Sequence, residues 1–240
     1  VWQVCYSPNG RTLASVSSDR TLRLWTTKGN LIKTYRDHTD TIWHVDFSPD
    51  GQHLITASED NTLRLWHIEK GLLQTIPAHE GGVWCAIFSP KGDFIASGGE
   101  DGDVRLWAVS SQNEQLTVEL EPSVFKGHRD WIRSLSFSPN GKFIASASDD
   151  DTVRLWFITA ATLTHKAEES GESQLLPPLT GHRDVIWDVD FDSTGERIVS
   201  AGADGTMRIW DLRLETLTDK GSRWLEDWLA ARPEVAKQLR

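Results

Sequence analysis

Asp60-Asn-Thr-Leu-Arg-Leu-Trp66 is one of five copies of a seven-residue motif in this chain of 240 residues. Every copy begins with Asp, has Arg at its fifth position and ends with Trp. The copies end at Trp25, Trp66, Trp107, Trp156 and Trp210. A histidine stands 28 positions before each of the last four tryptophans, at His38, His79, His128 and His182. Spacing kept this strictly over periods of 41 to 54 residues indicates internal structural repeats.

The second repeat shows how each period is built. Residues 41–47, 53–58 and 62–66 are short segments in which apolar and polar side chains alternate, as they do in half-buried β-strands. The turn Ser48-Pro49-Asp50-Gly51 separates the first two segments, because Pro fixes φ and Gly accepts a positive φ. We therefore expect an all-β chain with about four antiparallel strands in each period.

An early histidine and a late tryptophan in periods of this length resemble the repeats of WD-repeat β-propellers, over residues 1–212. The resemblance implies a ring of radial, four-stranded blades. Gly precedes the histidine only at Gly127 and Gly181, and Asp follows the last motif residue only at Asp211. The histidine of the first repeat would lie before Val1, so we expect a first repeat that lacks its opening strand and further repeats upstream.

The same resemblance implies a hydrogen-bonded chain of His, Asp, Ser and Trp inside each blade. Its Asp stands six positions before the tryptophan and its Ser eight positions before. The expected members are His38, Ser58, Asp60 and Trp66; His79, Asp101 and Trp107; His128, Ser148, Asp150 and Trp156; and His182, Asp204 and Trp210. Gly99 and Gly202 occupy the Ser position in the third and fifth repeats, which are therefore expected to lack one member.

Ser, His and Asp together also suggest a hydrolase. The trio recurs in several repeats, however, and no nucleophile elbow or oxyanion loop accompanies it. We expect a structural role for these residues and no enzymatic activity.

A second tryptophan series stands five positions after each histidine position. It comprises Trp2, Trp43, Trp84 and Trp187, and Arg133 takes the place in the fourth repeat, close to Trp131. The resemblance places these positions on one face near the central channel, together with acidic residues seven positions before the motif tryptophans. The expected partner-binding set is Trp2, Thr41, Trp43, Glu59, Trp84, Glu100, Trp131, Arg133, Asp149 and Trp187.

Tryptophans surrounded by carboxylates suit a protein or peptide segment that bears Lys or Arg, because indole rings attract cations and dominate many interfaces. The alternative is that these tryptophans pack between blades and only fill the channel wall. The sequence leaves both interpretations open.

Composition narrows the classes of partner. The chain has 35 acidic and 25 basic residues, a net charge of −10, so nucleic acid is not an expected partner. No apolar run approaches the roughly 18 residues of a membrane span, and we expect a cytoplasmic protein. Cys5 and Cys85 have no metal-ligand spacing, and no metal or cofactor is expected.

The regions outside the regular periods are expected to be loops and a helix. Residues 109–118 and 159–174 lengthen two periods and are interpreted as inserted loops. In the tail, residues 213–240, the spacing of Trp224, Leu225, Trp228 and Leu229 predicts a short amphipathic helix. This tail resembles the C-terminal segment of large bacterial, notably cyanobacterial, WD-repeat proteins, many of which carry an upstream signalling nucleoside triphosphatase module; no Walker sequence is present here.

Together these features predict a non-enzymatic scaffold that binds a protein or peptide, as the partner-sensing end of a larger signalling protein. The alternative is a purely architectural role, in which the repeats are spacers within a longer array.

Overall fold

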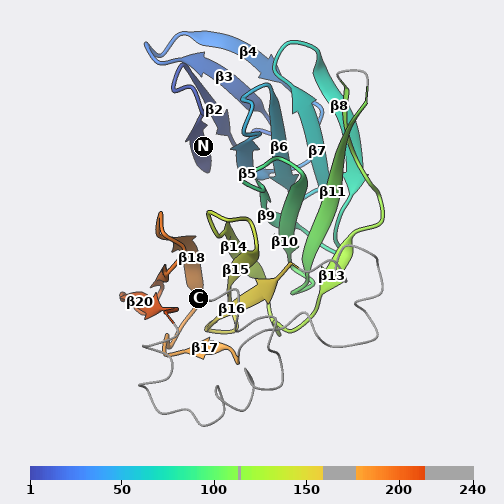
Figure 1. Cartoon of the computed structure of the whole chain (residues 1–240). Coiled ribbons are helices and arrows are strands. Elements are labelled where there is room, and N and C mark those ends of the chain that lie inside the picture. Colours follow the sequence, from blue (N-terminus) through green and yellow to red (C-terminus); the bar gives the residue numbers. More distant parts are fainter. Residues whose placement is uncertain (113–114, 159–176, 214–240) are drawn as a thin grey trace.

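The computed structural model describes residues 1–112, 115–158 and 177–213. These residues form five antiparallel sheets that follow one another in chain order around a common axis, like the blades of a propeller (Figure 1). The all-β fold predicted from the repeats is confirmed. In the described part of the chain there is no helix, and hence none long and apolar enough to cross a membrane.

The strands of each blade are consecutive in sequence. Blade 1 comprises β1 (Gln3–Tyr6), β2 (Thr12–Val16), β3 (Leu22–Thr26) and β4 (Leu31–Tyr35). Blade 2 comprises β5 (Ile42–Phe47), β6 (His53–Ser58), β7 (Thr62–His67) and β8 (Gly71–Pro77). Blade 3 comprises β9 (Val83–Phe88), β10 (Phe94–Gly99), β11 (Val104–Gln112), β12 (Gln115–Val118) and β13 (Ser123–Phe125). Blade 4 comprises β14 (Ile132–Phe137), β15 (Phe143–Ser148), β16 (Thr152–Phe157) and β17 (Leu179–Thr180), and blade 5 comprises β18 (Ile186–Phe191), β19 (Arg197–Gly202) and β20 (Met207–Asp211).

The blades are offset from the sequence repeats. The outer strand of blade 1 is β4, which follows the motif tryptophan Trp25 in sequence. The first blade is therefore a complete four-stranded sheet, whereas blade 5 has three strands in the described residues. The first repeat nevertheless lacks its opening strand, as expected, because the strand that opens a repeat belongs to the preceding blade.

The first insertion also differs from its prediction. Residues 109–118 are not a loop, because β11 extends to Gln112 and pairs with β12 as a hairpin, from Val109 opposite Val118 to Gln112 opposite Gln115. Hydrogen bonds between the two strands thus pair the backbone N–H and C=O groups of a segment whose polar sequence suggested a solvated loop. The insertion at 159–174 and the predicted tail helix lie outside the described residues, and the domain boundary at residue 212 stays a prediction.

The core consists of four apolar clusters, and each cluster joins two neighbouring blades. Between blades 1 and 2, for example, Leu22 and Leu24 pack with Val45, Phe47 and the indole of Trp66. The equivalent contacts recur between blades 2 and 3, 3 and 4, and 4 and 5. Because burying one large apolar side chain stabilises a fold by roughly 1.5–3 kcal/mol, packing between blades is the main source of stability.

Inside blades 2 to 5, a hydrogen-bonded chain ties the loop before the inner strand to the second and third strands, whereas blade 1 has only the bond from the Trp25 indole N–H to the Ser15 hydroxyl. In blade 2 the His38 Nδ1 is 2.8 Å from the Asp60 carboxylate, and the His38 Nε2 is 2.7 Å from the Thr56 hydroxyl. The Trp66 indole N–H donates to the same hydroxyl oxygen at 2.9 Å. The chain recurs as Trp107, Ser97, His79 and Asp101; as Trp156, Ser146, His128 and Asp150; and as Trp210, Ser200, His182 and Asp204.

The hydroxyl member of this chain is not the one expected from the sequence. It stands ten positions before the tryptophan, not eight, and a hydroxyl residue occupies that position in all five repeats. Ser58 and Ser148 instead donate to backbone carbonyl oxygens, those of Thr41 and Asp130. The third and fifth repeats are therefore not one member short. A Cβ at Gly99 or Gly202 would lie 2.8 Å or 2.7 Å from the ring of the repeat's histidine, so this position packs against the imidazole instead of bonding to it.

The hydrogen-bond partners of His38 determine which of its ring nitrogens carries the proton. Since the carboxylate can only accept, Nδ1 of His38 carries the hydrogen and Nε2 accepts from the Thr56 hydroxyl, which in turn accepts from Trp66. Burial lowers the pKa of His38, which keeps the ring neutral, although the hydrogen bond to Asp60 opposes this. Burial raises the pKa of Asp60, but hydrogen bonds from His38 and Thr62 outweigh it and hold that pKa well below its usual range.

The two candidate hydroxyls of blade 2 are distinguished by paired substitutions. Thr56→Val keeps the side-chain shape but removes the partner of two buried ring nitrogens, so we expect a loss of about 2–4 kcal/mol in the free energy of unfolding. Ser58→Ala removes the bond to the Thr41 carbonyl oxygen and a longer one from the Asp60 backbone N–H, and should cost about 1 kcal/mol. Urea unfolding of both variants measures the difference, and equal losses would contradict this assignment.

Asp46 links blades 2 and 3. One of its carboxylate oxygens accepts the backbone N–H of Phe88 at 2.8 Å. Burial of the carboxyl between blades raises the pKa of Asp46 to about 6, although backbone hydrogen bonds from Phe88 and Phe47 oppose the increase. The folded protein therefore holds the proton more tightly than the unfolded chain, and the stability contributed by the neutral form is lost as the pH rises toward about 6.

Asp46→Asn removes the ionisation and keeps an oxygen that can accept from Phe88. We expect this variant to be more stable than the wild type by about 1–2 kcal/mol at pH 7.5, because its side chain is never charged. The advantage should disappear near pH 4, where the carboxyl is protonated in the folded protein. Unfolding curves of both proteins at the two pH values measure it, and a difference independent of pH would refute the role given to ionisation.

Candidate functional site

The second tryptophan series lies at the start of the inner strands, on the side of each strand that faces the axis. In blades 2, 4 and 5 the ladder register shifts around Trp43, Arg133 and Trp187, so each is the extra residue of a β-bulge. The ladder of blade 3 shifts in the same way opposite Trp84. A bulge re-aims the side chain that it carries. The strands thus place one residue of each of these blades on the same inner surface.

Four indole rings from four blades lie in one row on this surface. Trp43 and Trp84 are stacked, with ring centroids 4.4 Å apart and an angle of 18° between the planes. Trp2 is tilted against Trp43 at 4.7 Å, and Trp131 is stacked on Trp84 at 5.5 Å. Each such pair contributes roughly 0.5–1.5 kcal/mol beyond the burial of its surface. The row is therefore a rigid wall built from several blades.

Arg133 ends this row and joins it to the last blade. Its guanidinium carbon lies 4.2 Å from the ring centroid of Trp84, 4.9 Å from that of Trp131 and 5.2 Å from that of Trp187. Two of its nitrogens donate to the two carboxylate oxygens of Asp149, at 2.7 and 2.6 Å. Arg133 is thus a cation held in place by stacking and by a bidentate ion pair.

The expected acidic residues lie beside this surface, but two of the three have internal partners. Glu59 accepts the indole N–H of Trp43 at 2.7 Å, and Asp149 pairs with Arg133. The Glu100 carboxylate lies against Gly81, where a Cβ would approach it to 2.9 Å. The expected Thr41 contributes its backbone, since its carbonyl oxygen accepts the N–H of Glu59.

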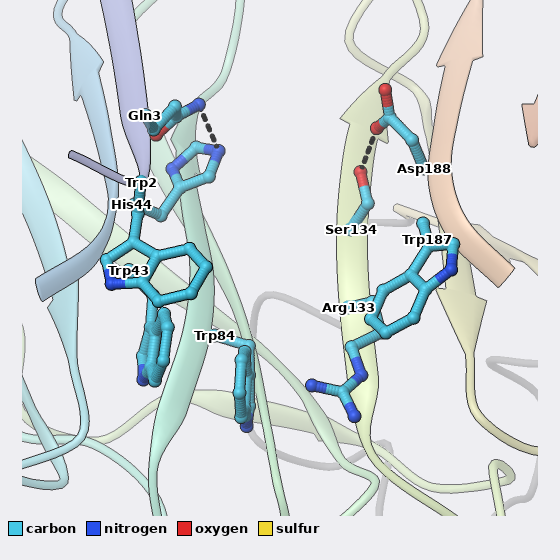
Figure 2. Close-up of a pocket in the computed structure, with 9 residues that line it drawn as sticks. All are labelled: Trp2, Gln3, Trp43, His44, Trp84, Arg133, Ser134, Trp187 and Asp188. Carbon is cyan, nitrogen blue, oxygen red and sulfur yellow. Dashed lines mark hydrogen bonds between the residues drawn. The ribbon is translucent and has the colours of Figure 1, made fainter. Parts of the chain in front are cut away.

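Between the indole row and the last two blades lies a cavity of about 390 Å³. Figure 2 shows Trp2, Trp43 and Trp84 on one side of it, and Arg133 and Trp187 on the other. Trp2 and Trp187 are 58% and 54% exposed, whereas Trp43, Trp84 and Trp131 are partly buried. The rings pack on one another, and Trp2, Trp43, Trp84 and Trp187 also line an open cavity. Partner binding by this series stays a prediction.

Four further residues line the cavity that sequence reasoning missed: Gln3, His44, Ser134 and Asp188. Each follows a member of the tryptophan series by one position. Gln3 donates to Nε2 of His44 at 2.9 Å, and Ser134 donates to Asp188 at 2.7 Å, so these pairs join neighbouring blades (Figure 2). Burial lowers the pKa of His44 to about 4, which leaves its ring neutral. Their constant position, one residue after each member of the tryptophan series, is the sequence feature that could have identified them as cavity residues.

Three of the repeat histidines and both cysteines are committed to the scaffold. The side chains of His38, His79 and His128 are fully buried and bonded on both ring nitrogens. Burial raises the pKa of Cys5 to about 12 and also raises that of Cys85, so neither is a thiolate at neutral pH. Within residues 1–112, 115–158 and 177–213, no group of three or more His, Cys, Asp or Glu residues is arranged to hold a metal ion.

Comparison with known proteins gives matches of two kinds. The profile of the WD40 family (WD domain, G-beta repeat) matches five segments that together cover most of the chain: residues 1–26, 29–67, 70–108, 121–156 and 173–211. The curated relatives match over single short segments. Striatin-4 from Homo sapiens is 52% identical over 33 residues, which are 14% of this chain and 4% of that protein. Striatin from Homo sapiens is 41% identical over 39 residues, 16% of this chain and 5% of that protein.

These relatives are therefore matched over only a small part of their length, and the likeness is to a repeat unit. The five profile matches, in contrast, each coincide with one period of the sequence, and from the second match on each spans the outer strand of one blade and the first three strands of the next. The chain belongs to the WD40 repeat family.

Proposed function

We propose that this chain is a non-enzymatic scaffold that binds a protein or peptide segment in the cavity lined by the tryptophan series. The observation that supports this most is the row of indoles that ends in the exposed Trp2 and faces the exposed Trp187 across the cavity. Tryptophan is enriched among residues that dominate binding energy, and a wall held rigid before binding reduces the entropy lost on association. The cavity volume lies within the roughly 300–1,000 Å³ typical of ligand pockets.

The proposed segment bears a Lys or Arg side chain, and we place its cationic group over Trp2 and Trp43. The guanidinium of Arg133 already covers the rings of Trp84, Trp131 and Trp187, which leaves the other end of the row free for a second cation. The ion pair with Asp149 neutralises Arg133, and the chain as a whole carries a net charge of −10. Both features favour a basic segment over an acidic one.

The wider parts of the prediction remain predictions. A larger signalling protein of the bacterial type, with an upstream nucleoside triphosphatase module, rests on residues 221–240, which lie outside the described residues. The expected cytoplasmic location rests on composition alone. The short striatin segments do not bear on either. The architectural alternative differs from the proposal in one measurable respect, since spacer repeats need no occupied cavity.

Two pools of short fluorescein-labelled peptides, identical except for one fixed central residue, Arg or norleucine, test the proposal by fluorescence anisotropy. We expect the full chain to bind the Arg pool more tightly. Trp2→Ala and Trp43→Ala should weaken binding of the Arg pool roughly tenfold or more, because each removes an indole face from the cavity.

Leu120→Ala is the matched control, since Leu120 is an exposed apolar residue outside the cavity. Trp2 is mostly exposed, so its replacement should leave the unfolding curve nearly unchanged and separate binding from folding. Equal binding by the wild type and both tryptophan variants would favour the architectural role. Equal affinity for the two pools would remove the cationic preference and leave the binding site itself intact.

A further inference from the structure

The turn between the first two strands of blade 4 contains the dipeptide Asn140-Gly141. In an Asn-Gly pair the backbone nitrogen of the glycine can attack the side-chain Cγ of the asparagine, because glycine has no side chain that hinders the approach. A succinimide ring closes as the new C–N bond forms, and ammonia leaves with the proton of the backbone nitrogen. Water then adds to one of the two ring carbonyl carbons and opens the ring to aspartate or to isoaspartate.

Hydrogen bonds of the folded turn hold both reacting groups. The backbone N–H of Gly141 donates to the carbonyl oxygen of Ser138 at 2.8 Å, so the nucleophile is engaged within the turn. Oδ1 of Asn140 accepts from the Ser138 hydroxyl at 2.7 Å and from the backbone N–H of Lys142 at 2.9 Å. The side chain of Asn140 therefore has to release its partners before its Cγ can approach the Gly141 nitrogen.

Packing between blades holds the same turn from two sides. Gly141 has a φ of +70°, and Pro90 of blade 3 lies against it, with its Cδ 3.7 Å from the position that a Cβ would have. Pro139 lies in the same way against Gly195 of blade 5, at 3.3 Å. The side chain of Asn140 is itself exposed, so water reaches its amide. Conformation, and not burial, therefore protects it.

Blade 2 shows that the turn accepts the aspartate product. Asp50 stands at the equivalent position of the turn, between a proline and a glycine. Its Oδ1 accepts from the Ser48 hydroxyl and from the backbone N–H of Gln52, the same two bonds that Asn140 accepts in blade 4. Isoaspartate has no such counterpart, because it adds one carbon atom to the main chain and displaces the hydrogen bonds of the turn.

We propose that Asn140 is a latent modification site, which the closed turn protects from deamidation and which reacts only when this turn opens. The rate of reaction then follows the population of the open turn. Aspartate allows the turn to close again, whereas isoaspartate does not. Asn9 of blade 1 accepts the equivalent bonds from Ser7 and Arg11, and it provides an internal reference within the same molecule.

Incubation of the full chain in mildly alkaline buffer, with and without denaturing urea, tests the proposal. Chromatography and mass spectrometry of proteolytic peptides measure the asparagine, aspartate and isoaspartate forms of residue 140 over time. We expect Asn140 to react roughly tenfold or more slowly in the folded chain, because only the small fraction of open turns reacts.

Ser138→Ala separates the local turn from the whole fold. It removes the hydroxyl that bonds to Asn140, so deamidation at this position should become several-fold faster while the rate at Asn9 stays that of the wild type. Ser89→Ala is the matched control. Ser89 makes the equivalent bond to a backbone N–H in the blade 3 turn, which contains Lys91 in place of an asparagine, so the rate at Asn140 should not change.

Asn140→Asp tests the fate of the aspartate product. Because Asp50 makes the same two bonds in blade 2, we expect this variant to unfold at nearly the same urea concentration as the wild type.

Four results would overturn the proposal. The first is equal reaction of Asn140 in the folded and the urea-unfolded chain. The second is Ser138→Ala that reacts no faster than the wild type or accelerates Asn9 equally, which would assign protection to the whole fold. The third is Ser89→Ala that accelerates Asn140 as strongly as Ser138→Ala does. The fourth is a large loss of stability in Asn140→Asp. All of these readouts are independent of the proposed binding function.

Discussion

In each of blades 2 to 5, one hydroxyl oxygen serves an indole ring and an imidazole ring, and the rest of the architecture depends on it. In blade 2 the Thr56 hydroxyl accepts from the Trp66 indole and donates to the imidazole of His38, whose other nitrogen donates to Asp60. These hydrogen bonds tie the loop before the inner strand to the second and third strands of the blade. The hydrogen-bonded chain therefore fixes where the inner strand of the same blade begins. The first residues of that strand carry the side chains that line the cavity.

The sequence predicts the histidine, aspartate and tryptophan of this hydrogen-bonded chain, but it misplaces the hydroxyl residue. Histidine, aspartate and tryptophan recur at fixed spacing, so they are recognised without a structure. Thr56 and Ser58 are two positions apart on one strand, share a face, and are both small and polar. Only the register separates them, because Leu54 lies opposite Trp66 and places Thr56 at the diagonal position within reach of the indole.

The candidate site was predictable in the same uneven way. Its tryptophans stand out because indole recurs in four of the five repeats. Their neighbours Gln3, His44, Ser134 and Asp188 share one position in the repeat but are four different residue types, so no recurring letter marks them. Their role also depends on pairs formed between blades, which no pattern within a single strand contains. The partners of Glu59 and Asp149 escaped prediction for the same reason.

The indole row depends on the packing between blades. Trp2 stands at the end of the row, directly before β1, and Trp43 and Trp84 lie where the inner strands of blades 2 and 3 begin. Each contact between blades sets the distance between the residues that begin the two inner strands, as it does for Trp43 and Trp84. The packing that joins blades and the surface that binds a partner thus follow from the same repeat.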